Sequence, residues 1–423
     1  MRNRLNALLE WIGDVFWAVP ALLAAAGVVL AELALRHEPP DGWPRALAFA
    51  GDAAGARSLL GVIAGSAIGV AGTIFSITIA ALSLTSGQMG PRLLRNFLRD
   101  AGNKRTLGLF LLTFAFCISL QRGMGAGVTP GVPQLGLTMA VALALICTAA
   151  LAWFVHHVAS GINVETVIGL VQDELTAAVH RLTVDGTPQA GLQLAEPPPQ
   201  GVPLRCAATG YLRAIDYDDL ADWAARHKAL LSVLVRPGDF LHPASRIAEV
   251  MPATLAPEAA KAVRGAMTLG SRPAAAQDLE FAVRQLVEVA VRALSPGIND
   301  PFTAIAVLDR LGAALSGLAG RFFPPAAMLR DERVVLHRRV ITYRGLCDAM
   351  FHLIRQAGSG QAAVLIRMVE VIDEALDVEA GPDRREHLRR HVGLVREAGR
   401  KGITDSAGLA DLEARVVATL GRG

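Results

Sequence analysis

Four long apolar runs in the first 160 residues constrain this chain more than any other feature. They cover residues 15–35, 59–84, 106–120 and 135–158, and the second contains no charged residue. A helix needs roughly 17 to 25 such residues to cross the hydrocarbon layer of a membrane. The sequence therefore predicts a transmembrane domain over residues 1–160. The third run is short, so it needs local thinning of the bilayer or extra helical turns at its flanks.

The composition fits a protein that is partly embedded in lipid. Of 423 residues, 52% are hydrophobic and 19% are charged, against about 25% charged in ordinary soluble domains. These values argue against a wholly soluble, a disordered or a disulfide-rich protein. A net charge of +3 is too small to indicate a nucleic-acid partner. The four cysteines form no CxxC motif, so we expect no metal and no cofactor.

The charges of the loops predict how the chain is oriented. The loop between the second and third spans carries five basic residues and one acidic residue: Arg92, Arg95, Arg99, Asp100, Lys104 and Arg105. Basic loops stay on the cytoplasmic side of a membrane. This predicts that both termini, and everything after about residue 158, are cytoplasmic.

One face of the second span carries small and hydroxylic residues. The candidates for helix packing or for lining a pore are Gly65, Ser66, Gly69, Thr73, Ser76 and Ser83. We favour close helix packing, with hydroxyls bonded to carbonyls four residues earlier. The alternative is a polar path through an oligomer. The middle of this span has no charged residue, which disfavours a proton relay.

A short basic helix is predicted directly after the second span. It begins at Pro91 and places Arg92, Arg95 and Arg99 on one face, with leucines and a phenylalanine on another. This pattern is typical of a helix that lies on the inner leaflet, with its arginines near anionic lipid headgroups. A phosphate-ligand site made by the same arginines is the less favoured alternative.

The cytoplasmic half is predicted to begin with an exit helix and a proline-rich linker over 161–200, followed by a small β-rich unit over 203–252. Its expected strands are 210–215, 230–235 and 246–250. The spacing resembles the small sandwich of lipoyl and biotinyl carrier domains. Those carriers present a modified lysine at a hairpin tip. The corresponding turn of this chain, at 237–239, contains no lysine, so we reject a swinging-arm role.

Residues 257–423 are predicted to be helical. The expected helices are 278–294, 334–357, 362–379, 384–400 and 406–420. The basic residues near 384–391 are interpreted as a solvated face, and no histidine is paired with an acid at metal-ligand spacing in this interpretation. No catalytic motif is found, so an enzyme is the third choice of function.

A dense group of polar residues surrounds the end of one predicted helix and the start of the next. Its members are the ligand-site candidates Asp278, Glu280, Arg284, Asn299 and Asp300. We favour structural roles, with Glu280 and Arg284 on a solvated helix face and Asp300 as a helix cap. A ligand or cation site is the alternative.

Several motifs resemble the bacterial family of predicted membrane proteins called domain of unknown function 2254. They are GPRLLRNFLRD at 90–100, RPGDF at 236–240, QDLEF at 277–281 and ALSPGINDP at 293–301. The chain departs from the family at Met89 and Gly90, where Phe-Ser is expected, a change with no clear functional meaning. The resemblance covers most of the chain. It implies a location in the bacterial inner membrane and no particular activity.

The sequence thus predicts a mainly α membrane protein with four transmembrane helices. These precede a cytoplasmic domain with a small β-sandwich-like unit and a helical C-terminal region. Our leading hypothesis is a homo-oligomeric channel or permeation pathway for ions or small solutes, gated by the cytoplasmic domain. The alternative is a membrane-anchored sensor or scaffold that binds protein partners. The expected partners are the lipid bilayer and further copies of this chain, with no nucleic acid.

Overall fold

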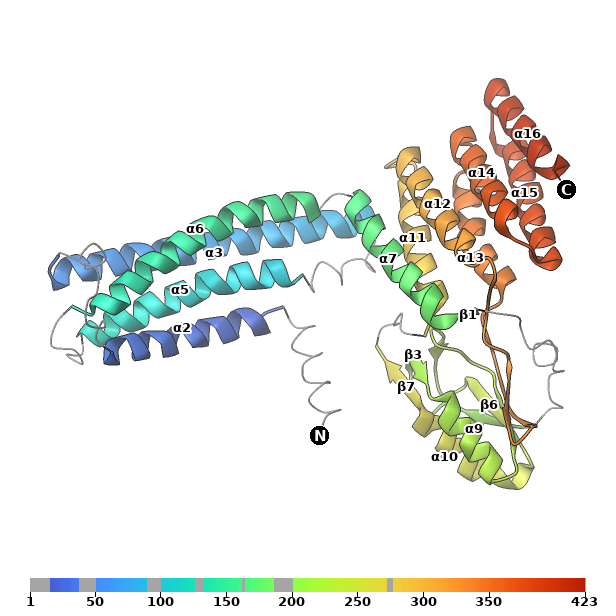
Figure 1. Ribbon diagram of the computed structural model, residues 1–423, viewed down its shortest axis with the longest axis horizontal. Helices are drawn as coiled ribbons and strands as arrows, with labels where there is room; N and C mark the ends of the chain where they lie inside the picture. Colours follow the sequence, from blue (N-terminus) through green and yellow to red (C-terminus); the bar gives the residue numbers. More distant parts are fainter. Residues whose placement is uncertain are drawn as a thin grey trace. The chain divides into compact units, whose positions relative to one another are not determined.

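A computed structural model describes residues 16–37, 51–89, 100–125, 132–161, 164–185, 201–271 and 277–422. The chain forms two compact units, Met1–Val167 and Ile168–Gly423, which are described one at a time (Figure 1).

The first unit is a bundle of long apolar helices. They are α2 (Ala18–Arg36), α3 (Ala53–Met89), α5 (Ala101–Gly125) and α6 (Gln134–Gly161). Each is long and apolar enough to cross a membrane, so the prediction of four candidate spans is confirmed. The helix of the third span has 25 residues, so of the two alternatives expected for it the extra helical turns at its flanks are confirmed, and thinning is unnecessary. The helix continues through polar and charged residues at both ends of the apolar run, which a count of apolar residues leaves out.

Helix α5 is the centre of this bundle and contacts each of the other three helices. Its buried side chains include Phe116 and Leu120, which pack in one core with Leu60 of α3 and Leu137 of α6. Helix α2 approaches α5 closely at Gly27, where a Cβ atom would lie 2.4 Å from the carbonyl oxygen of Leu112. A glycine at this position is what permits the contact.

The second unit combines strands with a layer of helices. Its strands are β1 (Val184–Asp185), β2 (Val202–Arg205), β3 (Gly210–Ile215), β4 (Leu230–Val233), β5 (Phe240–Leu241), β6 (Arg246–Met251), β7 (Met267–Gly270), β8 (Arg321–Phe322), β9 (Ala327–Arg330) and β10 (Arg333–Arg338). Its helices are α7 (Val164–Leu182), which begins just before the unit boundary, α9 (Tyr217–Arg226), α10 (Ala256–Ala266), α11 (Leu279–Ala293), α12 (Pro301–Ser316), α13 (Tyr343–Ala357), α14 (Ala362–Val378), α15 (Pro382–Gly402) and α16 (Ser406–Gly421), with a short 3-10 turn at Ala253–Leu255.

The strands form a five-stranded sheet in the order β2-β6-β4-β10-β9, a three-stranded sheet in the order β5-β3-β7, and the pair β1-β8. Strands β3, β4 and β6 lie where the sequence predicts them. Buried side chains of the two larger sheets share one core, which also contains residues of α9 and α10.

The expected boundary of the β-rich unit at residue 252 is wrong. Strand β7 pairs with β3, and β10 pairs in parallel with β4, so both sheets take strands from the region predicted to be helical. The helix predicted over 334–357 is α13 only from Tyr343, because Arg333–Arg338 is strand β10. Helix α9 also lies inside the predicted β unit. Strand pairing across about a hundred residues decides these elements, and local periodicity does not report it.

Candidate ligand-binding sites

Helix α11 divides the polar group that the sequence singles out. Asp278 caps the N-terminus of this helix, whereas Asn299 and Asp300 follow its C-terminus. Fifteen helical residues separate the two ends, which is roughly 22 Å at 1.5 Å per residue. The predicted candidates therefore do not form one site.

At the C-terminal end, both residues have structural contacts. The Asp300 carboxylate accepts hydrogen bonds from the Thr303 amide at 3.1 Å and from the Thr303 hydroxyl at 2.6 Å. The hydroxyl bond is the main reason that the pKa of Asp300 is lowered. Asn299 has a φ of +50°, and its side-chain oxygen accepts a bond from the Gln361 amide at 3.1 Å. These contacts are those of a helix cap and a tight turn.

At the N-terminal end, the charged side chains are buried and paired. Glu280 is 6% exposed, and it forms ion pairs with Arg236 at 2.8 Å and with Arg284. The prediction that Glu280 belongs to a solvated face is therefore wrong. Arg236 lies just after β4, so this cluster connects α11 to the strand region.

Asp278 lies beside this cluster and has an unusual carboxyl group. Burial raises its pKa to about 6, and the charge of Glu280 adds to this effect. Arg284 and Arg236 act in the opposite direction without cancelling it. The carboxylate also lies against the turn at Gly238, where a Cβ atom would be 2.2 Å from Asp278 Oδ2.

A pocket of about 210 Å³ lies next to this cluster. Its lining includes Tyr217, Arg236, Arg338 and Arg339, together with apolar and proline side chains. The Arg338 guanidinium lies 4.9 Å from the centre of the Tyr217 ring. Within the described residues Arg338 forms no ion pair with a carboxylate, whereas Arg236 and Arg339 each form one. Arginines in a partly desolvated pocket are suited to binding a carboxylate or phosphate group.

Several basic residues near 384–391 are engaged with neighbouring helices, so the interpretation of this cluster as a solvated face is wrong, although Arg390 is exposed. Arg385 donates to the carbonyl oxygens of Leu376 and Glu379 at the end of α14. His391 is fully buried and faces Asp348 of α13. This group was not predicted from the sequence, although Asp348 and His352 are four residues apart.

The candidate residues of α3 lie on the side of that helix that faces away from the bundle. The face carries Gly65, Ser66, Gly69, Thr73, Ser76 and Ser83, all of them exposed within one chain. A Cβ atom added at Gly65 or Gly69 would meet no atom within 4 Å. The predicted headgroup residues Arg92, Arg95 and Arg99 lie outside the described residues.

The hydroxyls of this face bond within their own helix. Thr73 donates to the Gly69 carbonyl at 3.2 Å, and Ser76 donates to the Gly72 carbonyl at 2.9 Å. The opposite side of α3 is buried in the core of the bundle, where Ala64 packs against apolar side chains of the other helices.

Comparison with known proteins gives a family and no activity. Residues 14–374 match the family described as predicted membrane protein, DUF2254. An uncharacterized protein of Mycobacterium tuberculosis is 31% identical over 429 residues, which covers 96% of this chain and 80% of the relative. An uncharacterized protein of Mycobacterium bovis matches equally well. No solved structure matches the chain.

Proposed function

We propose that this chain, which belongs to the DUF2254 family of predicted membrane proteins, is an oligomeric channel for ions or small solutes. Membership of the family does not itself specify any chemistry. In this proposal copies of the chain meet through the outward face of α3, and the second unit gates the path. The single observation that supports it is the small-residue face of α3, which is exposed and is not covered by any of the residues that the structure describes.

The outward side of α3 combines its small residues with large apolar ones such as Val62, which is 64% exposed, and Phe75, which is 48% exposed, and the other helices also expose large apolar side chains. Leu22 on α2 is 60% exposed and Leu145 on α6 is 67% exposed. Large apolar side chains of this kind suit contact with lipid tails. Gly65, Gly69 and Ser76 occupy the middle of the α3 face and present mostly backbone. In membranes such faces permit helix backbones to approach closely, so the occupant we propose is α3 of a second copy.

The hydroxyl groups make this face compatible with water as well as with packing. Thr73 and Ser76 already donate to backbone carbonyls, so neither needs a partner in another chain. Their oxygens can still accept bonds from water or help to replace the hydration shell of a permeating ion. Oligomer formation and conduction are therefore separate parts of the proposal and need separate tests.

Cysteine cross-linking tests the oligomer. We expect Gly69→Cys to form disulfide-linked dimers in native membranes. Leu145→Cys on the lipid-facing side of α6 is the matched control and should remain monomeric. The four native cysteines are buried and contribute little background. Equal cross-linking of the two variants would contradict contact through α3.

Labelling and conductance test the path. Ser66→Cys, Thr73→Cys and Ser76→Cys should react with a water-soluble thiol reagent, and the purified protein should conduct in planar bilayers. If cross-linking succeeds but these positions stay unlabelled and no gradient gives a current, the protein is an oligomer without a pore. That result would refute the channel.

The arginine-lined pocket supports a second candidate function, a membrane-anchored sensor of a small anion. Inorganic phosphate or a short carboxylate such as succinate should raise the melting temperature of the full-length protein in detergent. Arg338→Gln should remove this response, whereas Arg333→Gln, at an exposed position of the same strand, should retain it. An equal response in both variants would refute binding at this pocket.

We also propose that the protein lies in the bacterial inner membrane with both termini in the cytoplasm. The basic residues between α3 and α5 support this orientation. A reporter enzyme that is active only in the periplasm, fused after Leu182, should be inactive. Strong activity would reverse the orientation without affecting the argument about α3.

A further inference from the structure

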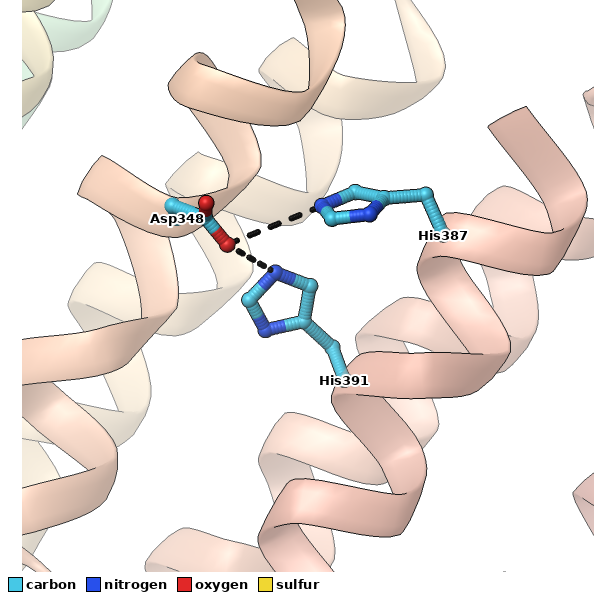
Figure 2. Close-up of side chains that lie close together, drawn as sticks. All are labelled: Asp348, His387 and His391. Carbon is cyan, nitrogen blue, oxygen red and sulfur yellow. Dashed lines mark ion pairs between the residues drawn. The ribbon is translucent and has the colours of Figure 1, made fainter. Parts of the chain in front are cut away.

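Two neighbouring helices of the second unit each present two side chains that can bind a metal. Helix α13 carries Asp348 and His352, and helix α15 carries His387 and His391. Each pair is four residues apart, so its members lie on the same helix face one turn from each other. The helices are in contact, and Figure 2 shows both histidines of α15 directed toward Asp348.

The distances between these groups match the spacing of ligands around a small divalent cation. From Asp348 Oδ1 to Nε2 of His391 is 3.1 Å, and to Nε2 of His387 is 3.6 Å. One ligand atom from each of the three residues lies within 4.8 Å of the others. Bonds of about 2.0 to 2.1 Å in a tetrahedral site place ligand atoms roughly 3.3 Å apart. Only small side-chain adjustments would therefore be needed to coordinate an ion.

The imidazole groups lack the hydrogen bonds that a purely structural network would provide. Both ring nitrogens of His391, Nε2 of His387 and Nδ1 of His352 are buried and make no aligned hydrogen bond among the described residues. His391 Nε2 lies 3.1 Å from Asp348 Oδ1, but this approach lacks the alignment of a hydrogen bond. His391 is fully buried. A buried polar atom without a partner destabilises the folded chain, and a bound cation would supply the partner that these nitrogens lack.

We propose that Asp348, His387 and His391 bind a divalent transition-metal ion of the zinc class. Two imidazoles and one carboxylate form a ligand set typical of zinc sites in which a fourth position stays open. The fourth position is left to water, because His352, whose Nε2 lies 3.0 Å from Asp348 Oδ1, is not among the residues whose ligand atoms all lie within 4.8 Å of one another. The site belongs to the second unit alone and does not depend on the channel proposal.

A pocket of about 520 Å³ lies beside the cluster and is lined by one of its proposed ligands. His387 lines this pocket together with Arg344, Glu386 and Arg390. A water molecule in the pocket could therefore complete the coordination, and an ion could reach the cluster from the same side.

Arg390 is the group that opposes metal binding most directly. Its guanidinium lies 3.2 Å from Asp348 Oδ1 and pairs with this carboxylate in the absence of metal. The Arg390 side chain is 43% exposed, so it is free to turn toward solvent when an ion takes its place. Removal of the Arg390 side chain should therefore strengthen metal binding. If the histidines formed only a structural network, the loss of Arg390 would not increase the affinity for a metal.

The test uses the full-length protein in detergent with Zn²⁺ and Co²⁺ as probes. The parent protein, after chelation and dialysis, should rebind one Zn²⁺ per chain and gain thermal stability. Bound Co²⁺ should give the visible absorption bands of a tetrahedral site. Asp348→Asn and His387→Gln should each weaken Zn²⁺ binding at least tenfold, and Arg390→Gln should strengthen it. The exposed His242 provides the control His242→Gln, which should bind as the parent does.

His387→Gln protects the test against a folding failure, because this side chain lies at the rim of the pocket and is 10% exposed. The proposal is overturned if the folded parent binds neither ion at micromolar concentration. It is also overturned if Asp348→Asn and His387→Gln bind as tightly as His242→Gln, since the ion then lies elsewhere.

Discussion

The carboxyl group of Asp278 connects the structure to a measurable pH dependence. Burial in the folded protein raises its pKa from an ordinary 3.8 to about 6. Between these values the folded protein holds a proton that the unfolded chain has released. A folded state that binds more protons loses stability as the pH rises. The contribution of Asp278 is thus fully present below about pH 3.8 and is lost as the pH rises through about 6.

The magnitude follows from the size of this change. The pKa rises by about 2.2, from 3.8 to about 6. At about 1.4 kcal/mol for each pKa unit, the charged form costs about 3 kcal/mol at pH 8. Asp278→Asn cannot ionise, and its side-chain oxygen can still accept the bond from the Phe281 amide. The variant should therefore be more stable than the parent at pH 8 by up to about 3 kcal/mol.

Thermal melting of the full-length protein in detergent between pH 4 and pH 8 measures this effect. A domain of this size changes its melting temperature by roughly 2 to 4 °C per kcal/mol, so we expect the variant to melt about 6 to 12 °C higher at pH 8. The two proteins should converge near pH 4. Asp411→Asn, at an exposed position of α16, is the control and should follow the parent.

Parallel melting curves for the parent and Asp278→Asn from pH 4 to pH 8 would refute this reasoning. A variant less stable than the parent at pH 8 would do the same. Either result would mean that Arg236 and Arg284 stabilise the charged carboxylate at least as much as burial destabilises it.

Three glycines give further predictions, all measured as shifts in melting temperature. Gly27→Ala should destabilise the membrane unit by several degrees because its Cβ atom would lie 2.4 Å from the Leu112 carbonyl oxygen; unchanged melting would contradict the close approach of α2 and α5. Gly238→Ala should destabilise the second unit, since Gly238 has a φ of +99° and its Cβ atom would meet Asp278 at 2.2 Å, a strain of about 1 to 3 kcal/mol. Gly393→Ala on α15 should stabilise by about 1 kcal/mol, because its Cβ atom would meet nothing within 4 Å, and a loss of stability there would count against this packing.

Local features of the sequence were sufficient to predict the positions of several helices. Helices α11, α14, α15 and α16 lie within two residues of their predicted positions because their apolar residues recur with helical spacing. The cap at Asp300 was also visible, since a short acidic side chain before a helix accepts bonds from its first amides. The equivalent cap at Asp278 was not predicted.

Long-range contacts decided what local patterns could not. Strand β10 was predicted as part of a helix, but it pairs with the neighbouring strand β9 and, about a hundred residues away in the chain, in parallel with β4. The burial of Glu280 depends on Arg236, which lies more than forty residues earlier in the chain. The candidate metal site depends on α13 meeting α15, although the four-residue spacings of its ligands were present in the sequence.

The sequence alone determined that the first part of this protein can cross a membrane four times, because span length and hydropathy are properties of each segment by itself. The tertiary structure alone decided that the small-residue face of α3 lies away from the bundle, that α11 separates Asp278 from Asp300, and that Asp348 faces two histidines. Each of these facts depends on how distant segments pack, and the free energy of packing depends on the whole arrangement of the segments.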